Sequence, residues 1–521
     1  MMRKYKRMIW ILLLAAASVG LYAGFIRERR TSQDLGVNQH DHSDLYRDQY
    51  SQDGAILNNT DNEASSASVK ATSAQAYTDA PRHNEDGLPH EKFQGMFEHS
   101  HDGTMHAHNQ DVTHMPRQYH ASPDPDRVIL NTTAIPEKSL AMNWRTDTTV
   151  TTGFVEWALA TPGPEFVASA QRLPATFETL RVKHGEEPII KANYFSAMVD
   201  GLTPGKKYVY RVGSDAGWSE WHQVRMPRPD KLAFIYFGDA QNDIKSMWSR
   251  VIREAYKITP EVDFMLHAGD LINRHDHDLE WGEWFYAGSF IHATIPGVMT
   301  PGNHEYGTGV VLSPNWRPQF NLPKNGPKGL EETCYSVNYS NLKVISLDAE
   351  QIDESPYYLE KQARWLDSVL THDPRKWTAV TLHYPFFSTK PNRDNEKLRG
   401  RFKPILDKHR VDIVLQGHDH AYGRGMVSNV PSGAGIKDGQ SGTMYVVSVS
   451  GPKMYDVSND PWMQRKARNT QLFQIISIEG ERLTYQAFTA SGELYDAFDL
   501  VKAGKKPNKV LNRIPNTPER Q

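Results

Sequence analysis

The sequence predicts an α/β domain preceded by a smaller all-β domain. Three observations support this fold class. Short apolar runs separated by turn residues fill residues 119–228, apolar strands alternate with helical segments over residues 231–500, and several of the later strands end in carboxylate, amide or imidazole side chains. A chain of 521 residues is also too long for one compact core, so more than one domain is expected.

Residues 1–30 have the pattern of an export signal. Basic residues between Arg3 and Arg7 precede an apolar run at residues 8–26, and charged residues close it. The run approaches the roughly 20 residues that span a bilayer. We favour an uncleaved membrane anchor over a cleavable signal peptide. Either one exports the protein to the periplasm or the extracellular space, and the anchor would tether it to the membrane.

Residues 31–118 are predicted to be a disordered linker. They show no sustained apolar period, so they bury too little apolar surface to offset the entropy of ordering. Ten of the 22 histidines of the chain lie between His40 and His120. These histidines could collect metal ions for the domain downstream, but we favour a polar linker with incidental histidines.

Residues 119–228 have the pattern of an all-β sandwich. Alternating apolar runs occur at residues 128–130, 140–144, 153–157 and 208–212. Short strands with regular turn signals are typical of a sandwich of about 100 residues. The turn at residues 201–205 and the strand after it resemble the corresponding part of a fibronectin type III-like domain.

Residues 231–500 alternate between strands and helices, as expected for an α/β domain. Strands are predicted at residues 232–237, 262–267, 343–347, 378–382, 411–415 and 444–449, and helices around residues 248–256 and 359–369. The tail at residues 501–521 is rich in Lys, Pro and Asn and is predicted to be disordered.

A cluster of polar residues follows the strands of this domain. Its members are Asp239, Asp270, Asn303, His383, His418 and His420. Ligands bind outside the carboxyl ends of strands in open α/β sheets, so these side chains are expected to converge. Carboxylate, amide and imidazole groups suit Mn, Fe or Zn.

The single cysteine, Cys334, excludes an internal disulfide and a thiolate cluster. It is expected to be a buried structural thiol.

The motifs around these residues are similar to those of a known family. Gly238-Asp239, Gly269-Asp270, Gly302-Asn303-His304-Glu305, Leu382-His383 and Gly417-His418-Asp419-His420 resemble the five ordered motifs of calcineurin-like metallophosphoesterases. The order resembles the purple acid phosphatase branch, whose members carry an N-terminal β-domain. The resemblance covers about residues 119–500. It implies a metallophosphoesterase β-sandwich flanked by helices and preceded by a fibronectin III-like domain.

The resemblance also implies a role for each residue of the motifs. Asp270 would bridge two metal ions. The first ion would be held by Asp239 and His420, and the second by Asn303, His383 and His418. His304 would protonate the leaving group, oriented by Glu305 or another carboxylate. The implied reaction is the hydrolysis of phosphomonoesters by attack of a metal-bound hydroxide, as in an acid phosphatase.

Two positions depart from the purple pattern. Asn273 stands where that branch has a tyrosine whose phenolate binds ferric iron, and Gln241 stands where relatives have histidine or glycine. Without the phenolate, Asp239 and Asp270 balance two divalent ions better than a ferric–divalent pair, so a colourless enzyme with Fe, Mn or Zn is expected. The amide oxygen of Gln241 could fill the place of the missing tyrosine, but we favour a supporting role behind the ligands.

Three neighbouring features allow two interpretations each. The loop Arg274–His277 could line the substrate pocket or be a solvated loop. Arg424 could pair with phosphate, but we favour a local carboxylate as its partner. Trp281, Trp284 and Phe285 have helical spacing and are expected in the core rather than at a substrate platform.

The expected partner of the chain is a small phosphorylated substrate. The formal net charge is -3 and no basic run lies near the motifs, so nucleic acid is not expected to bind. A phosphodiesterase or nucleotide hydrolase is the nearest alternative on the same site. A tethered binding module with an inactive phosphoesterase domain, and metal storage in the linker, are more distant alternatives. The sequence does not indicate an oligomeric state.

Overall fold

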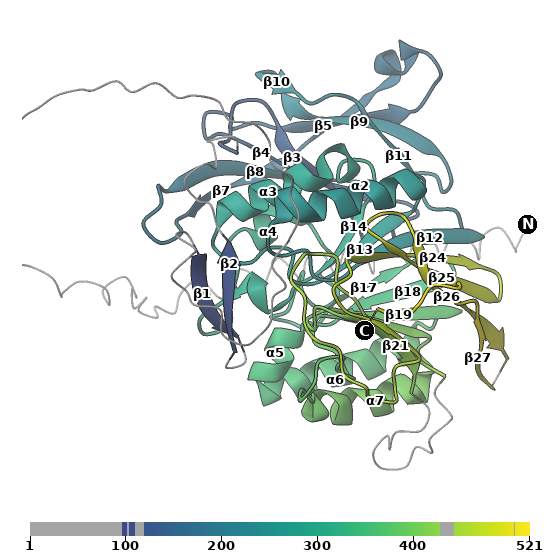
Figure 1. Cartoon of the computed structure of the whole chain (residues 1–521). Helices are drawn as coiled ribbons and strands as arrows, with labels where there is room; N and C mark the ends of the chain where they lie inside the picture. Colours follow the sequence, from purple (N-terminus) through teal and green to yellow (C-terminus); the bar gives the residue numbers. More distant parts are fainter. Residues whose placement is uncertain (1–95, 102–103, 110–118, 428–441, 505, 521) are drawn as a thin grey trace, which may run out of the picture. The chain divides into compact units, whose positions relative to one another are not determined.

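The computed structural model describes residues 119–427, 442–504 and 506–520, together with the backbone of residues 96–101 and 104–109. Within the described α/β region, two sheets pack face to face and helices cover both outer faces (Figure 1). This arrangement is the predicted sandwich of sheets flanked by helices, and the predicted fold class is confirmed.

The first sheet of the sandwich is built around three parallel strands. These are β12 (Lys231–Phe237), β13 (Phe264–Ala268) and β14 (Gly297–Thr300). Four antiparallel strands extend it beyond β12, namely β24 (Leu472–Glu479), β25 (Arg482–Thr489), β26 (Leu494–Ala503) and β27 (Lys506–Asn512). The parallel strands are buried along most of their length because helices cover one face and the second sheet covers the other.

The second sheet has the order β17-β18-β19-β20-β22-β21-β23. Its strands are β17 (Tyr335–Asn338), β18 (Leu342–Ser346), β19 (Trp377–Leu382), β20 (Ile413–Gln416), β21 (Tyr422–Met426), β22 (Met444–Val447) and β23 (Arg465–Ala467). Strands β18, β19, β20 and β22 are parallel, so their carboxyl ends lie at one edge.

The helices cover the outer faces of the two sheets. Helices α2 (Ser249–Ile258) and α3 (Asp278–Gly288) pack on the first sheet, and α5 (Ala349–Glu354), α6 (Pro356–His372) and α7 (Glu396–His409) pack on the second (Figure 1). Helix α6 begins where the Ser355 side chain accepts the Tyr358 N–H, and its residues Leu359, Ala363 and Leu366 are buried at helical spacing.

Short elements connect these layers. They are a π-helical turn at Ile244–Trp248, 3-10 turns at Ser289–Ile291 and Asn303–Glu305, helix α4 (Trp316–Gln319), and strands β15 (Tyr306–Gly307) and β16 (Val311–Leu312). Trp281 and Trp284 of α3 are fully buried and Phe285 nearly so, which confirms that these aromatic residues belong to the core. Cys334 is also buried, as expected for a structural thiol.

Residues 126–225 form a two-layer β-sandwich. One layer contains β3 (Asp126–Asn131), β4 (Leu140–Thr146), β8 (Ile190–Val199) and β7 (Thr176–Val182). The other contains β5 (Phe154–Leu159), β6 (Gln171–Pro174), β9 (Lys207–Ser214), β10 (Gly217–Trp218) and β11 (His222–Arg225), with a 3-10 turn at Pro164–Ser169. Trp144 and Phe195 stack with their ring centres 5.3 Å apart in the core between the layers.

This β-sandwich and the α/β region share a sheet. Asn131 of β3 pairs in parallel with Gly297 of β14, so the described strands of both regions form one sheet of eleven strands. The backbone N–H groups of Leu130 and Thr132 also donate to the carbonyls of His292 and Gly297, at 2.9 and 3.0 Å. The division between residues 228 and 231, read from composition, is therefore bridged by backbone hydrogen bonds.

Two predictions of disorder are wrong in part. In the predicted tail, residues 506–512 form strand β27 because the free edge of β26 offers backbone groups that pair with them. In the predicted linker, β1 (Met96–His101) and β2 (Thr104–Asn109) form an antiparallel hairpin.

The predicted anchor and most of the predicted linker lie outside the described residues. Among the residues that are described, no helix has the length and apolar character needed to cross a membrane.

Candidate metal centre

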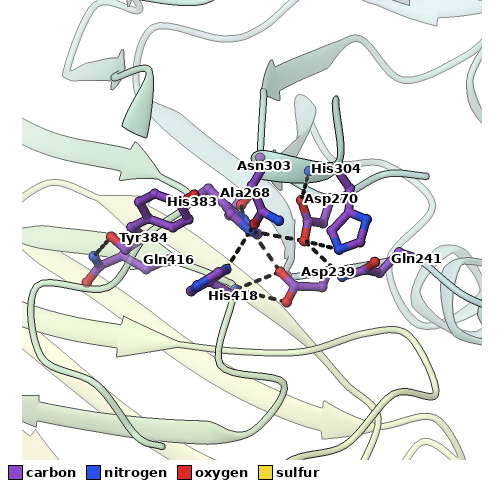
Figure 2. A network of polar contacts seen from close by, with 12 residues as sticks. Asp239, Gln241, Ala268, Asp270, Asn303, His304, His383, Tyr384, Gln416 and His418 are labelled. Carbon is purple, nitrogen blue, oxygen red and sulfur yellow. Dashed lines mark hydrogen bonds and ion pairs between the residues drawn. The ribbon is translucent and has the colours of Figure 1, made fainter. Parts of the chain in front are cut away.

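The six predicted ligands come together at the carboxyl ends of the central strands. Asp239 follows β12, Asp270 follows β13, Asn303 follows β14, His383 follows β19, and His418 and His420 follow β20. Because the two sheets face each other with these ends at the same edge, the loops of both sheets meet there. Figure 2 shows the side chains of Asp239, Asp270, Asn303, His383 and His418 turned toward one another.

Two glycines make this convergence possible. A Cβ atom at Gly302 would lie 2.2 Å from the Asp270 Oδ1 atom, and one at Gly417 would lie 2.2 Å from the Asp239 Oδ1 atom. Any larger residue would push the ligand-bearing loops apart. The glycines before Asn303 and His418 are therefore required by close approach of the backbone to the neighbouring carboxylates.

One group of possible ligand atoms surrounds the His383 imidazole. Its Nε2 atom lies 3.1 Å from Asp270 Oδ2, 3.1 Å from Asn303 Oδ1 and 3.2 Å from His418 Nδ1. The Nδ1–H of His383 donates to the Ala268 carbonyl at 2.9 Å, which leaves the Nε2 lone pair facing this group. These atoms are the donor set predicted for the second metal ion.

A second group shares Asp270 with the first. Asp239, Asp270 and His420 place three ligand atoms within 4.8 Å of one another, with His420 Nε2 3.5 Å from Asp239 Oδ2. The Nδ1–H of His420 donates to the Lys453 carbonyl at 3.1 Å, so its Nε2 lone pair also faces inward. The two groups correspond to the two ions predicted from the motifs, with Asp270 between them.

Three members of the cluster have strained backbones. Asp270, His418 and His420 have φ angles of 51°, 74° and 47°. Residues other than glycine rarely adopt this left-handed region, and such strain persists where the surroundings fix it, often at functional sites. The His418 N–H donates to both Asp239 oxygens at 2.8 Å, which helps to hold this conformation.

His304 lies beside the bridging carboxylate. Its Nε2 atom is 3.9 Å from Asp270 Oδ2, and its Nδ1–H donates to the Asn273 carbonyl at 2.6 Å. A backbone carbonyl therefore helps to orient this ring. Glu305 instead accepts the N–H groups of Asp270 at 2.9 Å and Gly302 at 2.7 Å, and so ties two of the ligand loops together.

Burial dominates the electrostatics of the site. It raises the pKa of Asp239 to about 7; the His383 imidazole opposes this shift, and the Asp270 carboxylate adds to it. Burial also raises the pKa of Asp270, but His383 and His304 more than offset it and hold that pKa well below its usual range. Two buried carboxylates at such close range cost free energy unless cations balance them.

Sequence reasoning missed a group of cations next to the site. Lys453 and Lys390 place their Nζ atoms 5.5 and 4.3 Å from the centre of the Tyr455 ring, which packs 4.7 Å from the His420 ring. Burial lowers the pKa of Lys453 to about 8, although Asp270 and Asp239 oppose the shift. The sequence signal was weak: Lys453 comes after β22 and a Gly-Pro pair, but a lone lysine at such a place has no motif spacing.

The loop Arg274–His277 packs against the β-sandwich and is only partly exposed. His277 is buried, and its Nε2 atom lies 3.1 Å from a carboxylate oxygen of Glu187 in the β-sandwich. Asp276 accepts from His184 of the same region at 2.7 Å. The loop therefore joins the metal site to the β-sandwich.

Arg424 does not face the cluster. It forms a buried bidentate ion pair with Asp496, with N–O distances of 2.8 and 3.0 Å. The expected pairing of Arg424 with a local carboxylate is confirmed.

Comparison with protein families agrees with this geometry. Residues 232–422 match the calcineurin-like phosphoesterase family, and residues 125–226 match the purple acid phosphatase N-terminal domain. Together the two matches cover more than half of the chain. The chain contains a calcineurin-like metallophosphoesterase domain preceded by a purple acid phosphatase N-terminal domain. The family predicted from the motifs is thus confirmed, and the metallophosphoesterase region carries all of the predicted metal ligands.

Known proteins resemble this metallophosphoesterase over part of their length. Acid phosphatase type 7 of Homo sapiens is 27% identical over 250 residues, which cover 43% of this chain and 55% of that protein. Purple acid phosphatase 21 of Arabidopsis thaliana is 27% identical over 234 residues, covering 43% and 51%. The chain therefore spans about half the length of these relatives.

A solved structure shares the fold. Purple acid phosphatase PPD1 from yellow lupin (Lupinus luteus) seeds superimposes with a TM-score of 0.59 at 18% sequence identity, covering 73% of this chain and 74% of that one. The two chains therefore share a fold over most of their length.

Proposed function

We propose that this chain is a two-metal phosphatase that hydrolyses phosphomonoesters outside the cytoplasm. The observation that carries the proposal is the pair of ligand groups that share the buried carboxylate of Asp270. Both groups contain oxygen and imidazole nitrogen donors, which suit Mn, Fe or Zn.

The residues present fit two metal ions. His383 and His420 each donate Nδ1–H to a backbone carbonyl, so that each keeps an Nε2 lone pair directed at the buried carboxylates. This hydrogen-bonding pattern is typical of metal-ligating histidines. Asp239 and His420 would hold the first ion, Asn303, His383 and His418 the second, and Asp270 both.

Bound ions would supply a water of lowered pKa and neutralise charge on the phosphate oxygens. The chain itself provides the acid. The Nδ1–H of His304 is fixed by the Asn273 carbonyl, so a proton on Nε2 is directed into the site and can pass to the leaving alkoxide. Lys453, beside the carboxylates, adds positive charge that attracts the phosphate dianion.

The relatives favour a phosphatase over the alternative phosphodiesterase or nucleotide hydrolase, since their names describe acid phosphatases. An inactive binding module is disfavoured because all six ligand positions are filled by residues that can bind metal.

An assay with two aryl esters tests the proposal. An aryl phosphomonoester and a bis-aryl phosphodiester would be compared on protein reloaded with Mn, Zn or Fe(II). We expect hydrolysis of the monoester to be much faster and to disappear on chelation. Faster hydrolysis of the diester would favour the alternative, and absence of both activities in protein loaded with two ions would favour the binding module.

The two ions are proposed to be divalent. The described site brings no phenolate to the carboxylates from position 273, where asparagine stands, so its ligand charge comes from Asp239 and Asp270. The purified enzyme is therefore expected to be colourless. A visible charge-transfer band would show a ferric–phenolate centre instead.

The location of the enzyme is also a proposal. Residues 8–26 would anchor it in the membrane, with residues 31–118 as a tether carrying the hairpin of β1 and β2. Full-length protein is then expected in the membrane fraction, and protein lacking residues 1–30 in the soluble fraction.

A further inference from the structure

We propose that the side-chain amide oxygen of Gln241 is a ligand of the first metal ion. This inference rests on the two-metal centre proposed above and adds a ligand to the ion that has fewer protein donors. The second ion has four protein donors, whereas the first has Asp239, Asp270 and His420. Gln241, one of the two positions that differ from the purple acid phosphatase pattern, lies next to these three residues.

The end of the Gln241 side chain occupies a ligand position. Its Nε2 atom lies 2.8 Å from Asp270 Oδ2 and 3.0 Å from His420 Nε2 (Figure 2 shows the contact with Asp270). Two ligands at right angles around an ion, each at the roughly 2.1 Å typical of such bonds, are about 3 Å apart. The spacings of 3.1, 3.1 and 3.2 Å around His383 in the second group are of the same size.

The hydrogen bonds of this amide depend on lone pairs that a metal ion would take. The NH₂ group donates to Asp270 Oδ2 and to the His420 Nε2 lone pair. A first ion held by Asp270 and His420 would compete for both of these acceptors, so the NH₂ group would face a cation. Rotation of the amide by half a turn places Oε1 there instead, without moving any other atom.

The outer amide atom supports this rotation. Gln241 Oε1 is buried and has no hydrogen-bond partner among the described residues. In either orientation of the amide, the terminal atom that faces away from Asp270 and His420 is unpaired. The two orientations differ in whether nitrogen or oxygen faces these two residues. The oxygen-inward orientation gains a bond to the ion, whereas the nitrogen-inward orientation directs two N–H groups at it.

The backbone holds Gln241 in this position. The N–H groups of Ala240 and Gln241 both donate to the Asp270 carbonyl at 3.0 Å. The residue is thus fixed to the loop of the bridging carboxylate. Gln241 would give the first ion the same kind of donor that Asn303 gives the second, and a neutral amide keeps the charge of the site suited to two divalent ions.

Two substitutions at Gln241 separate a ligand from a hydrogen-bond donor. Gln241→Leu removes both functions, whereas Gln241→Glu keeps an oxygen ligand but removes the N–H donor and places a like charge beside Asp270. Metal affinity would be measured by competition with a chelator, and the coordination of the first ion by the visible spectrum of cobalt-substituted protein. Gln362→Leu, at a buried glutamine that bonds to Asp348 instead, is the matched control.

We expect Gln241→Leu to weaken binding of the first ion about tenfold to hundredfold and to change the cobalt spectrum. Gln241→Glu is expected to bind the first ion at least as tightly as the natural protein. The inference is overturned if Gln241→Glu loses this ion as Gln241→Leu does, or if neither variant differs from the Gln362→Leu control.

The same titration separates the inference from the proposed function. Natural protein that binds two ions, combined with loss of the first ion in Gln241→Glu, refutes the ligand role and leaves the two-metal centre in place. Natural protein that binds fewer than two ions refutes both.

Discussion

His304 is the residue whose placement most directly implies a chemical role. One ring nitrogen is held by the Asn273 carbonyl and the other lies 3.9 Å from the Asp270 carboxylate. Since it belongs to neither ligand group, its removal should affect proton transfer and leave metal binding unchanged.

We predict that His304→Asn lowers kcat roughly a hundredfold to ten-thousandfold for an alkyl phosphate, whose alkoxide needs a proton. The loss should be smaller for an aryl phosphate, whose phenolate leaves more easily. Steady-state kinetics on both esters and metal analysis of the variant check this. His372→Asn, at an exposed histidine at the end of α6, is the control. An equal loss on both esters would argue against the role as acid.

At the residue scale, the sequence predicted which side chains come together. The convergence of the six predicted ligands was predictable because each lies shortly after a strand, and parallel strands bring such residues to one edge. The partners of His304 and Glu305 were not predictable, because they are backbone groups of loops whose course depends on the tertiary fold. Lys453 was missed because one lysine after a strand has no distinctive spacing.

The segment from Asn273 to Glu280, which leads into α3, supports the site. The Glu280 carboxylate accepts the N–H groups of Asn273 and Arg274 at 2.7 and 2.8 Å and pairs with the Arg274 side chain at 2.9 Å. Burial acts to raise the pKa of Glu280, but the hydrogen bond and charge of His277, together with Arg274, lower it to about 2. The ordinary value is 4.5, so the folded state favours the ionised form.

We predict that Glu280→Gln destabilises the protein by about 2 kcal/mol near neutral pH, as expected for the loss of charged hydrogen bonds. Because the folded pKa is depressed, this contribution is complete above pH 4.5 and is lost as the pH falls toward about 2. Urea unfolding of both proteins from pH 7 to pH 3 measures the difference, which should shrink on acidification. A difference independent of pH would contradict the prediction.

Glu283, which lies with Glu280 in α3, provides a control because its pKa is shifted in the opposite direction. Burial raises its pKa to about 7, so ionisation opposes folding as the pH rises from about 4.5 through about 7. Glu283→Gln should therefore have little effect at pH 4 and stabilise the protein above pH 7.

At the element scale, buried strands and helices were predictable and marginal strands were not. The apolar runs of β12, β13, β19 and β20 allow few other structures. Strand β27 contains Lys, Pro and Asn, a composition typical of disorder, and it forms because β26 supplies a free edge to pair with. Such pairing is a tertiary effect that local composition does not reveal.

At the scale of the whole molecule, a buried ion network joins the β-sandwich to the metallophosphoesterase region. Asp278, at the start of α3, pairs with Arg127 of β3 at 2.8 Å and Arg145 of β4 at 3.4 Å, and all three are buried. Together with the shared sheet, this network makes the two regions depend on each other. The boundary read from composition gave no indication of it.

We predict that the described regions unfold in a single cooperative transition in calorimetry of the full-length protein. Asp278→Ala should lower the free energy of unfolding by about 4 kcal/mol, because it leaves the buried guanidinium of Arg127 without its charged partner. Two resolved transitions in the natural protein would show instead that the regions are energetically independent.

The two-ion centre on Asp270 is tested most directly by anomalous diffraction from crystals of the protein reloaded with Mn or Zn. Two peaks are predicted, roughly 3.5–4 Å apart as in other two-metal sites, one on either side of the Asp270 carboxylate. A single peak, or peaks away from Asp270, would contradict the proposed centre.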